Sequence, residues 1–173
     1  MKDASILLVD DDRHVLDSMS NWLRSLGYHL DPVASFHDAV EHLQRNRYDL
    51  VLSDIRLDDA DGFALLKFCC EQFPQTSVIL MTGYATMDTG VEALRAGAFD
   101  LLTKPLIDQE LEMSISRALS QREVLAENKQ LKAQLDTRVG LDNIVGHDPR
   151  MQHVFDVIEN VAETRATVLI TGE

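Results

Sequence analysis

The chain has 173 residues, 45% of them hydrophobic and 26% charged, and a formal net charge of −13. This composition is typical of a globular protein and argues against a disordered one, and the length suits one well-buried domain with an appendage. The negative charge would repel phosphates, so we expect no direct nucleic-acid binding by this chain. No apolar run reaches the ~20 residues of a membrane span, and the first one is too short for a signal-peptide core. The sequence therefore indicates a soluble, cytoplasmic protein with no membrane partner.

Five short apolar runs alternate with segments of helical periodicity. The runs cover residues 6–9, 29–34, 50–53, 77–81 and 100–103. Runs of this length, bounded by polar residues and separated by helix-length segments, predict a parallel sheet wound by helices. Pro32 removes an N–H group from the second run, which predicts that this strand lies at an edge of the sheet. We expect an α/β fold.

The sequence between these runs also indicates where helices begin and end. Asp12 stands where the first helix would take its N-cap, and Gly27 stands where that helix would end. In the fourth helical segment, from about residue 87 to 96, the spacing of Val91 and Leu94 predicts that both side chains face the sheet.

A longer helix follows the fifth run. No Gly or Pro interrupts the chain between Asp108, a candidate N-cap, and Gly140. This permits one helix of about 30 residues, or ~45 Å at 1.5 Å per residue. Its first turns would cover the sheet with four apolar residues, Leu111, Ile115, Ala118 and Leu119.

The second half of this helix lies beyond that core and still carries apolar residues at heptad spacing. With Val124 and Leu131 at d positions, Asn128 and Leu135 fall at a positions. A buried Asn at an a position fixes a parallel two-stranded register, so the pattern predicts a homodimer through this helix. A solvated linker helix with Asn128 exposed is the alternative, and both interpretations stay open here.

Residues 140–146 break the long helix, and a different segment follows. Its apolar residues indicate a strand-like start and an amphipathic helix, and residues 166–173 predict a strand that enters a glycine loop. A lone strand and helix do not bury this much apolar surface by themselves. We interpret the segment as the first piece of a severed domain.

Chemically active residues stand at the ends of four predicted strands: Asp10 and Asp11 after the first, Asp54 at the third, Thr82 at the fourth and Lys104 at the fifth. Ligand sites of open parallel sheets collect at the carboxyl ends of strands. Carboxylates brought together there repel one another, and a bound divalent cation relieves the repulsion. All-oxygen ligands favour Mg²⁺ or Mn²⁺. The group therefore predicts a metal-assisted phosphoryl-transfer site.

Asp54 is the candidate nucleophile of that site. It stands alone at the end of the central strand, and a carboxylate can accept a phosphoryl group as an acyl phosphate. Thr82 could hydrogen-bond a phosphoryl oxygen, and Lys104 and the metal would neutralise the charge of the phosphoryl group.

These residues resemble a known family. Segments 7–12, 53–55, 61–62, 81–84 and 97–105 are similar to the motifs of receiver domains of two-component response regulators. The resemblance implies a receiver domain over residues 1–120, with a flavodoxin-like (βα)5 fold and a five-stranded parallel sheet in the order 2-1-3-4-5.

The same resemblance implies roles for the site residues. Asp54 would be the phosphoacceptor, loaded from a phosphohistidine on a sensor histidine kinase. Mg²⁺ would be held by Asp11, by Asp54 and by the backbone carbonyl of Arg56, with Asp10 assisting through water. Thr82 and Lys104 would bind the phosphoryl group and switch with it.

A second resemblance covers the end of the chain. Residues 143–151 and 166–173 are similar to the opening of the AAA+ ATPase domain of NtrC-type activators of sigma-54 RNA polymerase. This implies a helical coiled-coil linker over residues 121–139 and a truncated AAA+ start over residues 140–173. The parent protein would be an ATPase that works with sigma-54 RNA polymerase and DNA. Because the phosphate-loop lysine and the helix-turn-helix of that family are missing here, we expect no ATP hydrolysis by this chain.

Two positions depart from the receiver pattern. Asp58 stands where a proline commonly follows the phosphorylation loop, and Leu101 stands where a Tyr or Phe usually turns inward on activation. We therefore expect switching through the loop and helix after Thr82, which carry Tyr84 and Met87. Leu101 would pack passively.

The leading interpretation is a phosphorylation switch that controls dimerisation or oligomerisation of an AAA+ activator, in either direction. The alternative is a Mg²⁺-dependent phosphohydrolase that acts through an aspartyl phosphate. Such an enzyme needs a second acid near its nucleophile and a cap over its substrate, whereas Arg56 stands two residues after Asp54 and no cap insertion is visible. A coiled-coil dimer module with a silent acidic pocket is the third possibility.

Overall fold

The computed structural model of the protein describes residues 4–84, 86–137, 154, 157 and 169. The chain divides into two units, Met1–Leu125 and Ala126–Glu173. The first unit holds the whole sheet. The segment predicted as the start of an AAA+ domain, residues 140–173, lies almost entirely outside the described residues. No helix of the described part is both long and apolar enough to cross a membrane.

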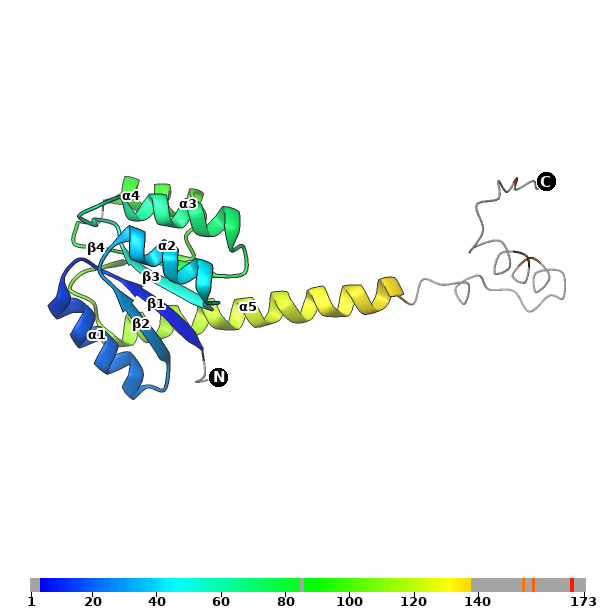
Figure 1. The fold of residues 1–173 in the computed structure, drawn as a ribbon, viewed down its shortest axis with the longest axis horizontal. Helices are drawn as coiled ribbons and strands as arrows, with labels where there is room; N and C mark the ends of the chain where they lie inside the picture. Colours follow the sequence, from blue (N-terminus) through cyan, green and yellow to red (C-terminus); the bar gives the residue numbers. More distant parts are fainter. Residues whose placement is uncertain (1–3, 85, 138–153, 155–156, 158–168, 170–173) are drawn as a thin grey trace. The chain divides into compact units, whose positions relative to one another are not determined.

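Five parallel strands form one sheet in the order β2-β1-β3-β4-β5 (Figure 1). They are β1 (Ser5–Val9), β2 (His29–Val33), β3 (Leu50–Asp54), β4 (Ser77–Thr82) and β5 (Asp100–Thr103). The predicted order 2-1-3-4-5 and the flavodoxin-like fold are confirmed. Strand β2 lies at an edge, with Pro32 opposite Leu8 of β1, as the missing N–H group of the proline requires.

Five helices alternate with the strands. They are α1 (Arg13–Ser25), α2 (Phe36–Arg45), α3 (Gly62–Gln72), α4 (Met87–Arg95) and α5 (Asp108–Thr137). Asp12 caps α1 by accepting the N–H of His14, and Gly27 follows its end with a φ of 94°, which favours glycine. Helix α5 has 30 residues, as predicted, but begins at Asp108 itself, which is therefore not its N-cap.

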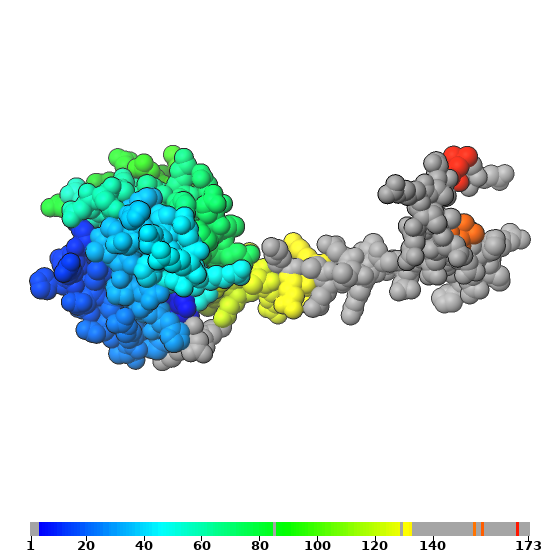
Figure 2. Space-filling view, in the orientation of Figure 1, coloured from blue at the N-terminus to red at the C-terminus, as the bar shows by residue number. Residues whose placement is uncertain are grey.

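The sheet separates two apolar cores (Figure 1). One face packs against α2, α3 and α4, and the surface of α2 and α3 is continuous in Figure 2. The other face packs against α1 and the first turns of α5. Leu111, Ile115 and Ala118 are buried there and Leu119 is partly buried, which confirms the prediction for the start of α5.

Helix α4 presents a different face to the sheet from the one predicted. Val91 is 43% exposed and Leu94 is 58% exposed, so neither lies on the inner face. The buried residue is Ala93, and the neighbouring Gly90 approaches Leu101 of β5. Small residues let the helix lie close to the sheet, and the larger ones are displaced outward. Met87, Val91 and Leu94 form an exposed apolar row at i, i+4 and i+7, which we call the α4 stripe.

Polar contacts fasten α5 to the amino-terminal edge of the sheet. Arg122 donates to the Asp49 carboxylate and, from Nε, to the Gln75 carbonyl at 2.8 Å. The second Asp49 oxygen accepts the Ser5 N–H at 2.8 Å. The amino-terminal ends of the neighbouring strands β1, β3 and β4 are thereby linked to Arg122 of α5.

Candidate functional site

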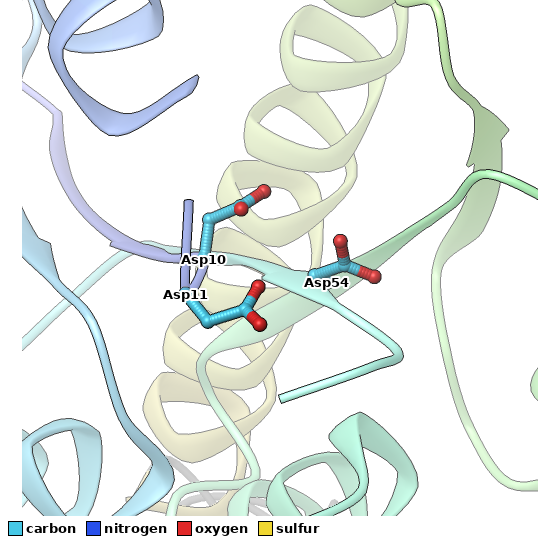
Figure 3. A group of neighbouring side chains, drawn as sticks. All are labelled: Asp10, Asp11 and Asp54. Carbon is cyan, nitrogen blue, oxygen red and sulfur yellow. The ribbon is translucent and has the colours of Figure 1, made fainter. Parts of the chain in front are cut away.

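The carboxyl ends of the strands bring the predicted site residues together. Asp10 and Asp11 follow β1, and Asp54 is the last residue of β3, the neighbour of β1 (Figure 3). Thr82 ends β4, and Lys104 comes directly after β5. The parallel arrangement therefore places all five at one edge of the sheet, as the sequence predicted.

Three carboxylates converge at this edge. One oxygen from each of Asp10, Asp11 and Asp54 lies within 4.8 Å of the others. Asp10 is fully buried and Asp54 is 8% exposed, whereas Asp11 is exposed. Two of the acids are thus fixed in the protein interior, and the third faces solvent, from which a cation would enter.

Lys104 bridges the two buried acids. Its Nζ lies 2.5 Å from Oδ2 of Asp10 and 2.5 Å from Oδ2 of Asp54. Burial lowers the pKa of Lys104, but the hydrogen bonds to Asp10 and Asp54 outweigh this, so the pKa lies above its usual value. Burial raises the pKa of Asp10 despite the bond from Lys104. The lysine therefore stays charged and compensates carboxylates that burial alone would disfavour.

The donor set suits a hard divalent cation. Three carboxylates and one ammonium group leave two uncompensated negative charges, and all the acidic ligands offer oxygen, which Mg²⁺ and Mn²⁺ prefer. Asp54 Oδ1 accepts the Arg56 N–H at 3.0 Å, and Asp10 Oδ1 accepts the Asp12 N–H at 3.0 Å. These bonds orient both carboxylates, so the residues present fit a magnesium site.

The loop between β3 and α3 also fits a magnesium site. The Leu57 N–H donates to the Ala60 carbonyl at 3.2 Å, and the Gly62 N–H donates to the Ile55 carbonyl at 2.7 Å. These two bonds close the loop, and neither of them uses the Arg56 carbonyl oxygen as its acceptor.

Thr82 and Lys104 are linked through the backbone. The Lys104 N–H donates to the Thr82 carbonyl at 2.7 Å, and the Thr82 hydroxyl accepts the Tyr84 N–H at 3.2 Å. Thr82 itself is 5% exposed. A movement of its hydroxyl would therefore act directly on the backbone of Tyr84, at the start of the connection to α4.

Two further site residues show contacts that the sequence did not predict. The Arg56 guanidinium lies 5.2 Å from the centre of the Tyr84 ring, a cation–π contact between the β3–α3 and β4–α4 loops. Tyr84 is otherwise 74% exposed. Leu101 is half-buried against the core on the α4 side, in keeping with a packing role.

The predicted dimer helix is uncovered in this chain. Val124 is 63% exposed and Leu131 is 52% exposed, and Asn128 is exposed as well. Leu135 lies within α5, but its side chain is outside the described residues. Pairing through these residues stays a prediction.

Comparisons with known proteins agree with the observed fold. Residues 6–116 match the response regulator receiver domain. The transcriptional regulatory protein ZraR of Salmonella typhimurium is 38% identical over 169 residues, which are 97% of this chain and 37% of ZraR. The chain therefore spans little more than a third of this relative.

Two solved structures extend the comparison. The beryllofluoride-activated NtrC4 receiver domain dimer has a TM-score of 0.66 and 30% identity, covering 70% of this chain and 99% of that one. NtrX from Brucella abortus, in complex with ADP, has a TM-score of 0.71 and 30% identity, covering 94% of this chain and 36% of that one.

The match over residues 6–116 defines a signalling domain, and the parallel sheet agrees with it. The chain belongs to the response regulator receiver domain family. Within this family it is similar to NtrC-type transcriptional regulators.

Gly62 supplies the first prediction, because a side chain there would collide with the site. A Cβ atom on Gly62 would lie 2.3 Å from the Asp54 carbonyl oxygen and 2.8 Å from the Ile55 Cα. Both neighbours are backbone, so they yield only if the loop moves. Although alanine favours a helix over glycine, we expect Gly62→Ala to lower the free energy of unfolding by about 2 kcal/mol and to weaken Mg²⁺ binding, measured by urea unfolding and calorimetry.

Gly83→Ala is the matched control. A Cβ atom there meets nothing within 4 Å, so its stability should change by no more than about 0.5 kcal/mol. Equal effects of the two substitutions would contradict the collision at Gly62.

Proposed function

We propose that Asp54 is a phosphoacceptor, loaded from a phosphohistidine on a sensor histidine kinase. The observation that carries this proposal is the bridge from Lys104 to Asp54 and Asp10 beside the converging carboxylates. Asp54 is the acid that lies between the others and Thr82, because β3 pairs with both β1 and β4. The family assignment agrees with this role, since receiver domains are signalling domains.

Each side chain has a part in the proposed transfer. A carboxylate oxygen of Asp54 bonds to phosphorus while the phosphorus–nitrogen bond of the donor breaks and the imidazole keeps the bonding electrons. Lys104 would then bind a phosphoryl oxygen with the ammonium group that now bridges the acids, and the Thr82 hydroxyl would hydrogen-bond another. Asp11, Asp54 and the Arg56 carbonyl, with Asp10 assisting through water, would hold Mg²⁺ (or Mn²⁺), which would supply positive charge to offset the phosphoryl oxygens.

The receiver would control a larger protein. We propose domain boundaries of 1–120 for the receiver, 121–139 for the linker and 140–173 for the start of an AAA+ domain. The ADP complex of NtrX, which covers 94% of this chain, supports a further domain after the linker. In the parent protein that domain would hydrolyse ATP and work with sigma-54 RNA polymerase and DNA in the cytoplasm, functions we do not assign to this segment itself.

The alternatives fare less well. A phosphohydrolase would need a second general acid, that is a proton donor, near the nucleophile, and the residue two positions after Asp54 is Arg56, whose guanidinium lies over Tyr84. A silent acidic pocket would not need a lysine that bridges two buried carboxylates. The signalling interpretation uses the three converging carboxylates and Lys104 together.

Labelling tests the phosphoacceptor. Incubated with Mg²⁺ and a small acyl phosphate, the wild-type chain should gain the mass of one phosphoryl group, and Asp54→Asn should gain none. Asp58→Asn, an exposed acid of the same loop, is the matched control and should be labelled normally. In light scattering, Mg²⁺ with beryllofluoride should change the molecular mass of the wild type and leave that of Asp54→Ala unchanged. Labelling of Asp54→Asn, or none of the wild type, would contradict the proposal.

We also propose that switching travels through Thr82 to α4. Thr82 holds the Tyr84 N–H, and the α4 stripe (Met87, Val91 and Leu94) begins three residues later and is exposed. A shift of the loop after Thr82 would therefore change the orientation of the α4 stripe, which a second receiver could contact. Leu101 would pack passively.

Methyl NMR tests this route. On addition of Mg²⁺ and beryllofluoride, the methyl signals of Met87, Val91 and Leu94 should move more than that of Val40, which lies on α2. If the stripe signals stay in place while the site is saturated, switching does not pass through α4.

The linker helix is the proposed dimer contact. The solved NtrC4 receiver is a dimer, and Val124, Asn128, Leu131 and Leu135 give this chain a heptad face of its own. Leu131 and Leu125 are similarly exposed, at 52% and 61%, but only Leu131 stands at a core position of the heptad.

Leu131→Ala should therefore raise the dimer dissociation constant at least ~10-fold, since a buried leucine is truncated in each partner. Leu125→Ala is the matched control and should raise it less than about threefold, equivalent to less than ~0.7 kcal/mol. Sedimentation of both variants checks this prediction. Equal effects, or a wild type that is monomeric in every phosphorylation state, would favour the solvated linker helix instead.

A further inference from the structure

Asp59 joins the phosphorylation loop to a helix from elsewhere in the chain. Its Oδ1 accepts the Phe36 N–H at 2.9 Å, and its Oδ2 accepts the His37 N–H at 3.1 Å. Both donors belong to the first turn of α2, more than twenty residues earlier. We call this pair of bonds the Asp59 tie.

The tie adds to a helix end that already has its own cap. Ser35 caps α2 by accepting the Asp38 N–H at 3.0 Å. The bond from Phe36 holds the pKa of Asp59 below its usual range, so the carboxylate is ionised at neutral pH and complements the positive end of the helix dipole. Since α2 has a cap without Asp59, the loop gains the most from the tie.

Besides bonds within itself, the loop contacts other parts of the chain through the Asp59 tie and through the cation–π contact between Arg56 and Tyr84. Within the loop, Leu57 and Gly62 donate to the carbonyls of Ala60 and Ile55, and Asp61 caps α3. These bonds fix the shape of the loop but not its direction away from the sheet. Position 58 holds an aspartate, so the backbone there has more conformations to lose on ordering than it would with a proline.

We infer that Asp59 is a positioning residue for the phosphoryl-transfer site: by tying the tip of the loop to α2, it holds the Arg56 carbonyl beside Asp54. This inference rests on the proposed role of that carbonyl in binding Mg²⁺. Asp59 touches neither metal nor phosphoryl group. It acts through three residues of backbone, from position 59 to Arg56.

The experiment compares Asp59→Asn with Asp58→Asn. Each removes one negative charge from an exposed neighbour of the site, but only Asp59→Asn removes an oxygen that accepts a bond from α2. Calorimetry with Mg²⁺ alone should give a dissociation constant about tenfold higher for Asp59→Asn than for wild type, the lower end of the range for groups that orient a metal ligand. Asp58→Asn should differ less than about twofold, equivalent to less than ~0.4 kcal/mol.

Two more readouts separate positioning from plain stability. Ser35→Ala removes the cap of α2 and keeps the tie, so it should lower the unfolding midpoint without changing the Mg²⁺ dissociation constant. At saturating Mg²⁺, the maximal rate of labelling by a small acyl phosphate should recover in Asp59→Asn to within about twofold of wild type, because the metal then holds the loop in place.

The outcomes are distinct. If the wild type is labelled and Asp59→Asn binds Mg²⁺ as Asp58→Asn does, the inference is overturned and the proposed function stands. A rise in the Mg²⁺ dissociation constant with Ser35→Ala equal to that with Asp59→Asn would also overturn it, since the effect would then be one of helix stability. If the wild type binds no Mg²⁺ and is not labelled, the proposed function itself fails.

Discussion

One ammonium group shared by two buried carboxylates holds the end of the sheet together. Lys104 follows β5, and its Nζ reaches past β4 to Asp54 on β3 and to Asp10 after β1. A buried carboxylate without a partner would cost several kcal/mol, so the bridge makes the acidic cluster compatible with a folded core. It also leaves the cluster with an excess of two negative charges, which a divalent cation would neutralise. A phosphoryl group on Asp54 would then compete with Asp10 for the lysine, so the same contact that stabilises the resting chain responds to modification.

The loop after Asp54 is constrained in a second way, by close packing. Gly62 packs so closely on the Asp54 carbonyl that no side chain fits, and the Asp59 tie fixes the far tip of the loop on α2. Between these points lies Arg56, whose N–H orients Asp54 and whose guanidinium lies over Tyr84. Asp54, Arg56 and the loop that carries Tyr84 are thus connected through direct contacts of Arg56.

Local sequence signals predicted the elements and the site because they depend on chain order and strand ends. The proline in β2, the cap at Asp12 and the acids at the carboxyl ends of β1 and β3 each report a property of their own neighbourhood, and parallel pairing of the strands brings these ends together. The α4 stripe was misjudged for a physical reason. Helical spacing shows which residues share a face, but not whether that face turns inward. Here the small Gly90 and Ala93 take the inner side because the helix lies close to β5. The Asp59 tie and the contact between Arg56 and Tyr84 join loops far apart in sequence, so no local pattern signals them.

The net charge decides which part of the receiver can act on a partner. Two copies that each carry −13 repel, and a phosphoryl group adds close to two further negative charges. Bulk charge therefore opposes pairing, and at physiological salt it is screened beyond ~8 Å. An attractive contact has to come from apolar surface, at roughly 25 cal/mol per Å² buried. The described residues offer such surface on the α4 stripe, which follows Thr82 within a few residues, and on the second half of α5. In the proposed switch, phosphorylation would favour or oppose pairing by changing which of these apolar side chains a neighbour meets, and the stripe lies nearer to Thr82 in the sequence than the second half of α5 does.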